Sequence, residues 1–375
     1  MWYRSSMAKR ITQKDIGEAL GVSYITVQRA LNDSGYVSKE VKSKILDYAA
    51  KTKYSPHKAA KSLVRKKTRI IALYSSNFPQ YFWADVKRGA MIGRQQIAPF
   101  NYEVYYRFIP AWDSKAYLRQ LRSDIAAGVD AVGLVNQIFP DINTIFNLLE
   151  EKHIPYIMVN VDAPETNRLC YIGPDYPAGG RIAAEVILKM MKNLRRPKIG
   201  VILSSYSHEV KPAADIMLQR FNGFREVVAN SSIPVNLITK AIPQSEGPQK
   251  VEKEIDDFLA AHHDFAALYL IASYNEILER VIARNEQRGK LVTVVHDLDS
   301  RTEECLESEA ISAVIYQNPI LQGYYAVKLL EHFLETGKSL ESKTINIVHS
   351  IIMRQNKDLA KNNYLFAEII GELET

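Results

Sequence analysis

From residue 69 onward, short apolar runs alternate with amphipathic segments, and this alternation constrains the fold more than any other feature of the sequence. Residues 69–74 have the pattern of a buried strand and residues 82–97 that of a helix, and the alternation continues to residue 159. The same plan then repeats over residues 169–295. Strict strand–helix order with short loops predicts parallel sheets covered by helices on both faces, because each parallel strand is reached through a crossover. Two repeats of the plan predict two lobes.

Two later segments are expected to return to these lobes. Residues 319–335 are predicted to rejoin the first lobe as a helix, and residues 346–353 to rejoin the second lobe. The expected boundaries are about 68–165 and 318–345 for the first lobe, about 166–317 and 346–355 for the second, and 356–375 for a C-terminal tail.

Residues 11–32 have a different pattern, that of two short amphipathic helices joined by a glycine turn. Thr12 can cap the first helix, with Asp15 in the place of a capping-box acid. Gly21 supplies a position where φ can be positive, and Ser23 can cap the second helix. Ser38 is expected to open a third helix, whose inward residues would be Val41, Ile45, Leu46 and Ala49 and whose end is set by Tyr54-Ser55-Pro56.

The second of these helices is predicted to present a polar reading face. Its periodicity buries Val27, Ala30 and Leu31. The outward side then carries a phenol, an apolar side chain, an amide and a guanidinium, from Tyr24, Ile25, Gln28 and Arg29. Such groups near the start of a helix suit hydrogen bonding to base edges in a DNA major groove.

Charge is distributed unevenly along the chain. Residues 1–69 contain 16 Lys and Arg against 5 Asp and Glu, whereas the remainder contains 32 against 37. A basic excess confined to the helical N-terminal region is typical of a protein that binds a polyanion there. The alternative is a basic end that is merely solvated.

These residues together resemble the lac repressor family of bacterial transcription regulators. The resemblance rests on residues 11–32, on Val37-Ser38, and on Tyr54-Ser55-Pro56 followed by residues 59–63, and it continues to about residue 355. The usual Thr-Val-Ser-Arg of the second helix is Thr26-Val27-Gln28-Arg29 here, and Ile25 replaces a residue that is often polar.

The resemblance implies a helix-turn-helix DNA-binding domain at residues 9–56, after a leader at residues 1–8. It also implies a hinge helix at residues 57–67 that folds on operator DNA, where Leu63 and its dimer mate wedge into the minor groove. The alternative for this segment is a flexible linker. The DNA-binding residues expected are Thr12, Tyr24, Ile25, Thr26, Gln28, Arg29, Asn32 and Leu63.

The resemblance further implies that the body has the periplasmic-binding-protein type I fold and binds a small sugar or polyol. Ligands of open parallel sheets bind outside the carboxyl ends of the strands, where Asn160 and Asp297 fall. Phe82 and Trp83 match stacking aromatics of ribose-binding relatives, although both could be core residues. Arg220 matches an arginine that grips vicinal hydroxyls, although it could form a surface ion pair. The full expected set is Phe82, Trp83, Asn160, Arg220, Ser273, Asp297 and Gln317.

Several other classes of function are disfavoured. The chain has no Gly-x-Gly-x-x-Gly, Gly-x-Ser-x-Gly or His-Glu-x-x-His motif, so we expect no catalytic residues, metal or other cofactor. Cys170 and Cys305 have no disulfide or zinc spacing, and no apolar run could span a bilayer. We therefore expect a cytoplasmic protein that does not contact membranes. One headpiece covers only a few base pairs, so half-site geometry and the resemblance imply a homodimer that binds palindromic double-stranded DNA. A sugar-metabolising enzyme with a fused DNA-binding headpiece and a plain solute-binding module remain as alternatives.

Overall fold

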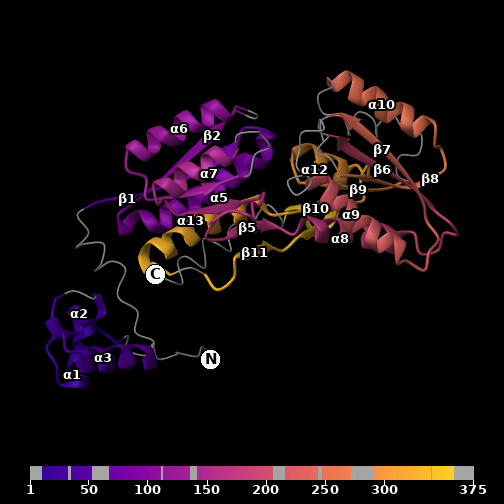
Figure 1. The fold of residues 1–375 in the computed structure, drawn as a ribbon. Coiled ribbons are helices and arrows are strands. Elements are labelled where there is room, and N and C mark those ends of the chain that lie inside the picture. The colour runs from indigo at the N-terminus through magenta and orange to yellow at the C-terminus, as the bar shows by residue number, and fades with distance from the viewer. Residues whose placement is uncertain are drawn as a thin grey trace. The chain divides into compact units, whose positions relative to one another are not determined.

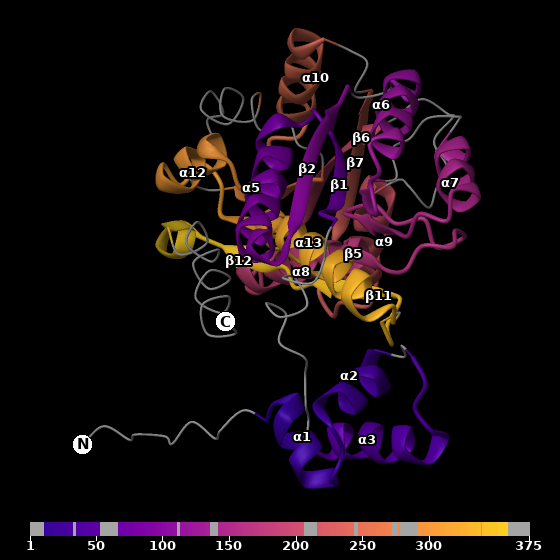
Figure 2. The same ribbon diagram turned by 90° about the vertical axis from the view of Figure 1, so that its left-hand side faces the viewer.

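The computed structural model describes residues 11–32, 35–52, 67–110, 113–135, 142–205, 216–243, 247–271, 277, 291–338 and 340–358. The chain divides into two compact units. The head comprises Met1–Thr68 with Pro99–Asn101, and the body comprises Arg69–Ala98 with Tyr102–Thr375. Figures 1 and 2 show both units as ribbons.

The head contains the helices α1 (Gln13–Leu20), α2 (Tyr24–Asn32) and α3 (Lys39–Lys51). The predicted capping box is confirmed: the Thr12 amide donates to Asp15 Oδ2 at 2.7 Å, and the Asp15 amide donates to Thr12 Oγ1 at 3.2 Å. Gly21 follows α1 with φ of 65°, and Ser23 Oγ accepts a bond of 3.1 Å from the Thr26 amide. The glycine turn and both caps therefore lie where the sequence predicted them.

Apolar residues from all three helices form the core of the head. Ile16, Val27, Ala30 and Ile45 are buried together. The expectation that Leu46 points inward is wrong, because 44% of its surface is exposed. Residue 45 of α3 already fills the core, and its neighbour in a helix is rotated by about 100° away from it.

The first lobe of the body is built on a fully parallel six-stranded sheet with the order β11-β5-β4-β3-β1-β2. Helices α6 and α7 pack on one face of this sheet, and α5 and α13 pack against each other in the same lobe. Its strands are β1 (Arg69–Ser76), β2 (Tyr102–Ile109), β3 (Ala131–Leu134), β4 (Tyr156–Val159), β5 (Tyr171–Pro174) and β11 (Thr344–Ile347). Its helices are α5 (Gln80–Ile97), α6 (Ser114–Ala126), α7 (Ile142–Glu151) and α13 (Pro319–Thr336). The short helix η1 (Ala98–Phe100) follows α5, and all of it except Ala98 belongs to the head.

The second lobe repeats the plan with the strand order β12-β10-β9-β8-β6-β7, in which only β12 runs antiparallel to its neighbour. The helix α8 packs on β9 and β10, and α10 packs on β7. Its strands are β6 (Lys198–Ser205), β7 (Asn236–Pro243), β8 (Phe265–Leu270), β9 (Val292–His296), β10 (Ala313–Tyr316) and β12 (Ser350–Ile352). Its helices are α8 (Tyr176–Met190), α9 (Ile216–Ala229), α10 (Pro248–Ala260), α12 (Ser300–Glu307) and η3 (Arg354–Asn356).

The two parallel-sheet lobes confirm the predicted fold class, but two lobe boundaries are wrong. The strand expected to open the second lobe, β5, pairs instead with β4 and β11 of the first sheet. A loop without a helix joins β4 to β5, so counting strand–helix repeats placed the boundary one strand too early. Residues 346–353 are also not one strand. They contribute to β11 in the first sheet and to β12 in the second, so the chain passes between the lobes within this segment.

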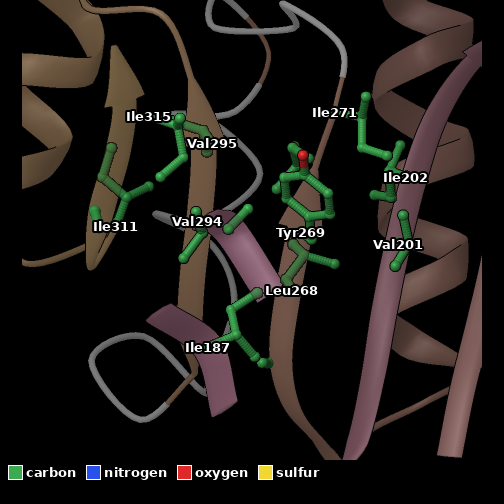
Figure 3. Packing of buried hydrophobic residues seen from close by; sticks show 14 of the residues in the cluster. Ile187, Val201, Ile202, Leu268, Tyr269, Ile271, Val294, Val295, Ile311 and Ile315 are labelled. Atoms are coloured by element: carbon green, nitrogen blue, oxygen red, sulfur yellow. The ribbon is translucent and has the colours of Figure 1, made fainter. Parts of the chain in front are cut away.

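The core of the second lobe lies between its sheet and its helices (Figure 3). Ile187 of α8 lies beside Leu268 of β8, and Val201 and Val294 come from the neighbouring strands (Figure 3). All four side chains are completely buried. A strand in a parallel sheet is covered on both faces, so its residues are apolar along its whole length.

Glycines allow one pair of helices in each lobe to cross closely. In the second lobe a Cβ on Gly180 of α8 would overlap the carbonyl oxygen of Arg220 of α9, and a Cβ on Gly223 would overlap that of Pro177. Side chains at these positions would force the helices apart. The same reciprocal pairing joins α5 to α13 in the first lobe, between Gly89 and Ile320 and between Gly323 and Val86.

Candidate nucleic-acid interface and ligand site

The outward face of α2 in the head is the candidate nucleic-acid interface. Tyr24 and Ile25 are 51% and 55% exposed, although both are large side chains that packing would normally cover. Arg29 is also exposed, and Gln28 and Thr26 are partly exposed. The structure thus brings the predicted base-reading side chains onto one helix, with Thr12 capping the helix before it.

Arg29 lies against the backbone that follows α2. A Cβ on Gly35, whose φ is 70°, would stand 3.2 Å from Arg29 Cδ and 3.3 Å from Arg29 Nε. The bare glycine therefore leaves room for the arginine stem. Asn32 ends α2, and Leu63 with most of the predicted hinge lies outside the described residues.

In the body, the predicted ligand residues Asn160, Asp297 and Gln317 form one buried network, which also contains Gln322. We call these four residues the interlobe polar cluster. Gln317 Nε2 donates to Asp297 Oδ1 at 2.6 Å, and Asn160 Nδ2 lies 3.3 Å from Gln317 Oε1 and 3.0 Å from Gln322 Oε1. Gln322 Nε2 in turn donates to the Gln317 carbonyl at 2.9 Å. The cluster joins the end of β4 in the first sheet to the ends of β9 and β10 in the second.

The backbone turns sharply where it supplies this cluster. Asn160 and Asp297 have φ values of 65° and 67°, and Asn318, which follows Gln317, has φ of 48°. Such left-handed conformations are uncommon for residues other than glycine, and Asn and Asp tolerate them best. Asn160 and Asp297 directly follow β4 and β9, and the turns place their side chains at the strand ends. Asn318 instead caps α13, with its Oδ1 accepting from the Leu321 amide at 3.3 Å.

Phe82 and Trp83 lie at the start of α5, in a buried apolar cluster with Val86 and Val135. Their rings meet edge to face with centroids 5.0 Å apart, and Trp83 Nε1 donates to the Phe78 carbonyl at 3.0 Å. Both side chains are packed as core in this structure, so their predicted stacking role stays a prediction.

Arg220 lies in the first turns of α9 and is 1% exposed, which excludes the surface ion pair considered from the sequence. Its Nη1 donates to the Ile271 carbonyl at 3.3 Å, and its guanidinium lies 5.3 Å from the ring centroid of Tyr176. The Tyr176 hydroxyl donates to the Asn160 carbonyl at 3.0 Å. The ring of Tyr176 thus connects Arg220 to Asn160 of the interlobe polar cluster. Ser273 lies outside the described residues.

Two histidines, His296 and His349, accompany Arg220. The Tyr269 hydroxyl and His296 Nε2 are 2.7 Å apart, and both histidines lie against Gly179. Burial, reinforced by the positive charge of Arg220, lowers the pKa of His296 well below its ordinary value. Burial and the same arginine lower the pKa of His349 to about 4. Both imidazoles are therefore neutral at pH 7.

Sequence reasoning missed Gln322, Tyr176, His296 and His349. Gln322 stands within a helix, and only its contacts with the two strand ends reveal its place. His296 directly precedes Asp297, which is a signal that could have found it.

Other chemistry has little support in the described part of the chain. No group of three His, Cys, Asp or Glu residues is placed there to hold a metal ion, and no helix there is long and apolar enough to cross a membrane. Cys170 and Cys305 are buried free thiols. Burial raises the pKa of the Cys170 thiol to about 11, so it is a poor nucleophile.

Known proteins share both parts of this arrangement. Residues 71–339 match the periplasmic binding protein domain, and residues 12–57 match the lacI family of bacterial regulatory proteins. The chain is 33% identical over 156 residues to the protein named "Probable HTH-type transcriptional repressor ExuR" of Bacillus subtilis, covering 40% of this chain and 44% of that protein. It is 27% identical over 254 residues to the ribose operon repressor of Bacillus subtilis, covering 65% of this chain and 68% of that protein.

Solved structures share the fold of the body. GanP, a glucose-galactose binding protein from Geobacillus stearothermophilus, has a TM-score of 0.65 at 20% identity, covering 78% of this chain and 99% of that chain. A sugar-binding protein of a sugar ABC transporter from Bacillus halodurans has a TM-score of 0.67 at 15% identity, covering 78% and 100%. The chain thus joins a helix-turn-helix domain of the lacI family of bacterial regulatory proteins to a body that belongs to the periplasmic binding protein domain family, and these are the two parts of a DNA-binding transcriptional regulator.

Proposed function

We propose that this protein is a transcriptional repressor that binds a palindromic operator as a homodimer and changes its operator affinity when a small sugar or polyol binds between the lobes. The observation that carries the proposal is the exposed reading face of α2, on a chain whose body has a buried polar cluster joining two sheets. A plain solute-binding module for transport does not account for that reading face.

On DNA, the basic head would supply phosphate contacts, which set affinity and make it fall steeply with salt. Tyr24, Gln28 and Arg29 would contact base edges and so specify the sequence. Thr12, Ile25, Thr26 and Asn32 would complete the interface.

A single helix-turn-helix covers only a few base pairs, and two heads related by a dyad would read the two halves of a palindrome. Leu63 of each chain would insert at the centre of the site and kink it. Replacing Leu63 by alanine should weaken operator binding, and equal affinity in that variant would remove the wedge from this mechanism.

In the body, the carboxylate of Asp297 and the amides of Asn160 and Gln317 would hydrogen-bond ligand hydroxyls. Arg220 and Ser273 would add contacts from the second lobe, and Phe82 with Trp83 would pack on the sugar from the first. Relatives named ribose operon repressor make a pentose the first effector to test.

Coupling would follow from the chain crossings. A ligand that draws the lobes together changes the hydrogen bonds of the interlobe polar cluster and hence the angle between the lobes. Coupling free energies of this kind are about 1 to 3 kcal/mol, or about 5- to 150-fold in operator affinity.

The test is selection of duplexes from a random pool by the purified protein, followed by affinity measurements with and without a panel of sugars and polyols. We expect a palindrome to be enriched and its affinity to change with one class of compound. If no duplex is preferred over random DNA under any condition, the proposal is wrong. Sedimentation of the protein with one palindromic duplex measures whether two chains bind.

A further inference from the structure

Unpartnered polar atoms gather in one place in the second lobe. Among the described residues, six buried side-chain atoms have no hydrogen-bond partner, and four of them belong to Arg220, His296 and His349. These are Arg220 Nε and Nη2, His296 Nδ1 and His349 Nε2. We call the three residues the cationic cluster, because Arg220 gives it a positive charge while both imidazoles are neutral at pH 7.

The members of this cluster come from three separate elements, and the two histidines converge on Gly179 in α8. A Cβ placed on Gly179 would lie 2.9 Å from His349 Nε2 and 3.4 Å from His296 Cε1. His296 ends β9, His349 lies between β11 and β12, and Arg220 belongs to α9. The backbone of Arg220 lies against Gly180, the next residue of α8, and the charge of Arg220 lowers the pKa of both imidazoles.

An unpaired guanidinium inside a protein is unfavourable, because it has lost its hydration without gaining a counter-charge. The other buried arginine of the body illustrates the usual solution. Arg168, 5% exposed, donates from Nη2 to Asp162 Oδ2 at 2.7 Å and from Nε to the other oxygen of the same carboxylate at 2.5 Å. Arg220 is more deeply buried, and its partners in the described part of the chain are one backbone carbonyl and one aromatic ring.

We propose that the effector carries an acidic group, a carboxylate or a phosphate, and that the cationic cluster binds it. This inference rests on the proposed function, because it names the class of the molecule that the body senses. Arg220 Nε and Nη2 are the pair of donors that binds two oxygens of one anion side by side. His296 and His349 would each contribute a ring nitrogen.

The position of the cationic cluster implies that the effector has an acidic end and a hydroxyl-bearing end. Tyr176 connects Arg220 to the carbonyl of Asn160, so the acidic end would lie in the second lobe and the hydroxyls would reach the interlobe polar cluster. Asp297 would then accept from hydroxyls and not face the acid. A neutral sugar could accept hydrogen bonds from the guanidinium through its hydroxyls, but it would leave the positive charge of Arg220 without a counter-charge.

Binding of an acid here is expected to take up protons. The titratable or charged groups that face the two imidazoles are Arg220 from α9, Asp175 and Tyr176 from the start of α8, and Tyr269 from β8. An anion between Arg220 and the histidines would oppose the arginine's field and raise the histidine pKa values. Affinity for a carboxylate should therefore increase as the pH falls from 7 toward 5, whereas affinity for a neutral ligand should show no such trend. A phosphate monoester gains a proton of its own at about pH 6, so the carboxylates are the compounds that test this trend.

The first experiment compares matched neutral and acidic compounds on the full-length protein by thermal shift and calorimetry. The panel pairs glucose with glucuronate and glucose 6-phosphate, galactose with galacturonate, and ribose with ribose 5-phosphate, with inorganic phosphate alone as a further arm. We expect one acidic member to bind about 10- to 150-fold more tightly than its neutral partner, the scale of hydrogen bonds to a charged group. Sugar acids and sugar phosphates are separate arms, so the result also names the anion. Equal affinity for the neutral partner would overturn the inference.

The second experiment needs no ligand. Arg220→Met removes an unpaired buried charge, and in a buffer of low ionic strength its Tm should equal or exceed that of the wild type. Arg168→Met is the matched control, and its Tm should fall because Asp162 loses its partner. If Arg220→Met lowers the Tm as much as the control does, the guanidinium already has its counter-charge and the inference fails.

A third variant separates loss of the paired donors from loss of the fold. Arg220→Lys keeps a charge but not the paired donors, and it should lose most of the acid's stabilisation even if Arg220→Met folds poorly. When no compound of the panel binds, the ligand-free comparison decides. Operator binding without effector is measured on the same variants, so a failed acid preference is distinguished from a protein that does not recognise DNA.

Discussion

Gln317 donates a hydrogen bond of 2.6 Å to the carboxylate of Asp297, and it does so at the point where the chain leaves the second sheet for the first lobe. The amide oxygen of the same side chain accepts from Asn160 at the end of β4. One side chain therefore holds strand ends of both lobes. An effector hydroxyl that binds Asp297 must compete with Gln317 for the carboxylate. Ligand binding would therefore change a hydrogen bond at the point where the chain passes from one lobe to the other.

Asp297→Asn should uncouple the effector from DNA binding while leaving the operator affinity of the free protein unchanged. The asparagine oxygen can still accept from Gln317, but a neutral acceptor binds a hydroxyl more weakly than a carboxylate by about 1 kcal/mol or more, or about tenfold in affinity. Titration of the operator complex with effector measures this. The control is Asp264→Asn, which removes a surface partner of Lys198. A wild-type effector response in Asp297→Asn would show that the carboxylate is no ligand contact.

Gly180→Ala should destabilise the second lobe. The new methyl group would overlap the carbonyl oxygen of Arg220, so α8 and α9 must separate. Overpacking of this kind lowers the free energy of unfolding by about 1 to 3 kcal/mol. Denaturant unfolding followed by circular dichroism measures the loss. Gly247→Ala is the matched control, because a Cβ there meets only one atom, at an ordinary 3.7 Å. Equal stability of the two variants would contradict the close crossing.

Stability should fall as the pH is lowered through the histidine range. The folded protein holds the pKa of His349 at about 4, below the value of 6.5 in the unfolded chain, and it lowers that of His296 in the same direction. The unfolded state therefore binds more protons between pH 6.5 and 4, so the stabilisation is complete above pH 6.5 and is lost as the pH falls. Tm measured against pH in His349→Gln should show a shallower decline than in the wild type. An identical decline would mean that His349 takes no part.

Gln28→Ala should relax base preference at one position of each half-site. Loss of a good amide–base contact costs about 1 to 3 kcal/mol, and that penalty is specific to the base contacted. Competition among duplexes that differ at single positions measures it. Lys14→Ala provides the contrast, because the loss of a basic side chain at the surface of the head is expected to weaken all duplexes alike and to reduce the salt dependence. Unchanged base preferences in Gln28→Ala would exclude this amide from base reading.

Much of the fold could be read from local patterns. The caps at Thr12 and Ser23 and the turn at Gly21 depend on contacts within a few residues, so the sequence predicted these parts of the head correctly. The strand and helix periods of the body likewise gave two parallel sheets. The strand and helix periods could not predict where the chain passes from one lobe to the other. The sequence of β5 would suit either sheet, and its place depends on its pairing with β4 and β11.

The sequence by itself determined the α/β class, the three-helix head, and the position of Asn160, Asp297 and Gln317 near strand ends, since each of these follows from periodicity, capping or local chain order. Only the tertiary structure decided that these residues bond to one another and to Gln322, that Phe82 and Trp83 are packed as core, and that Arg220 lies buried beside two neutral histidines. The reason is that hydrogen bonding and charge burial depend on which distant segments meet, and no local pattern along the chain encodes the distance between them.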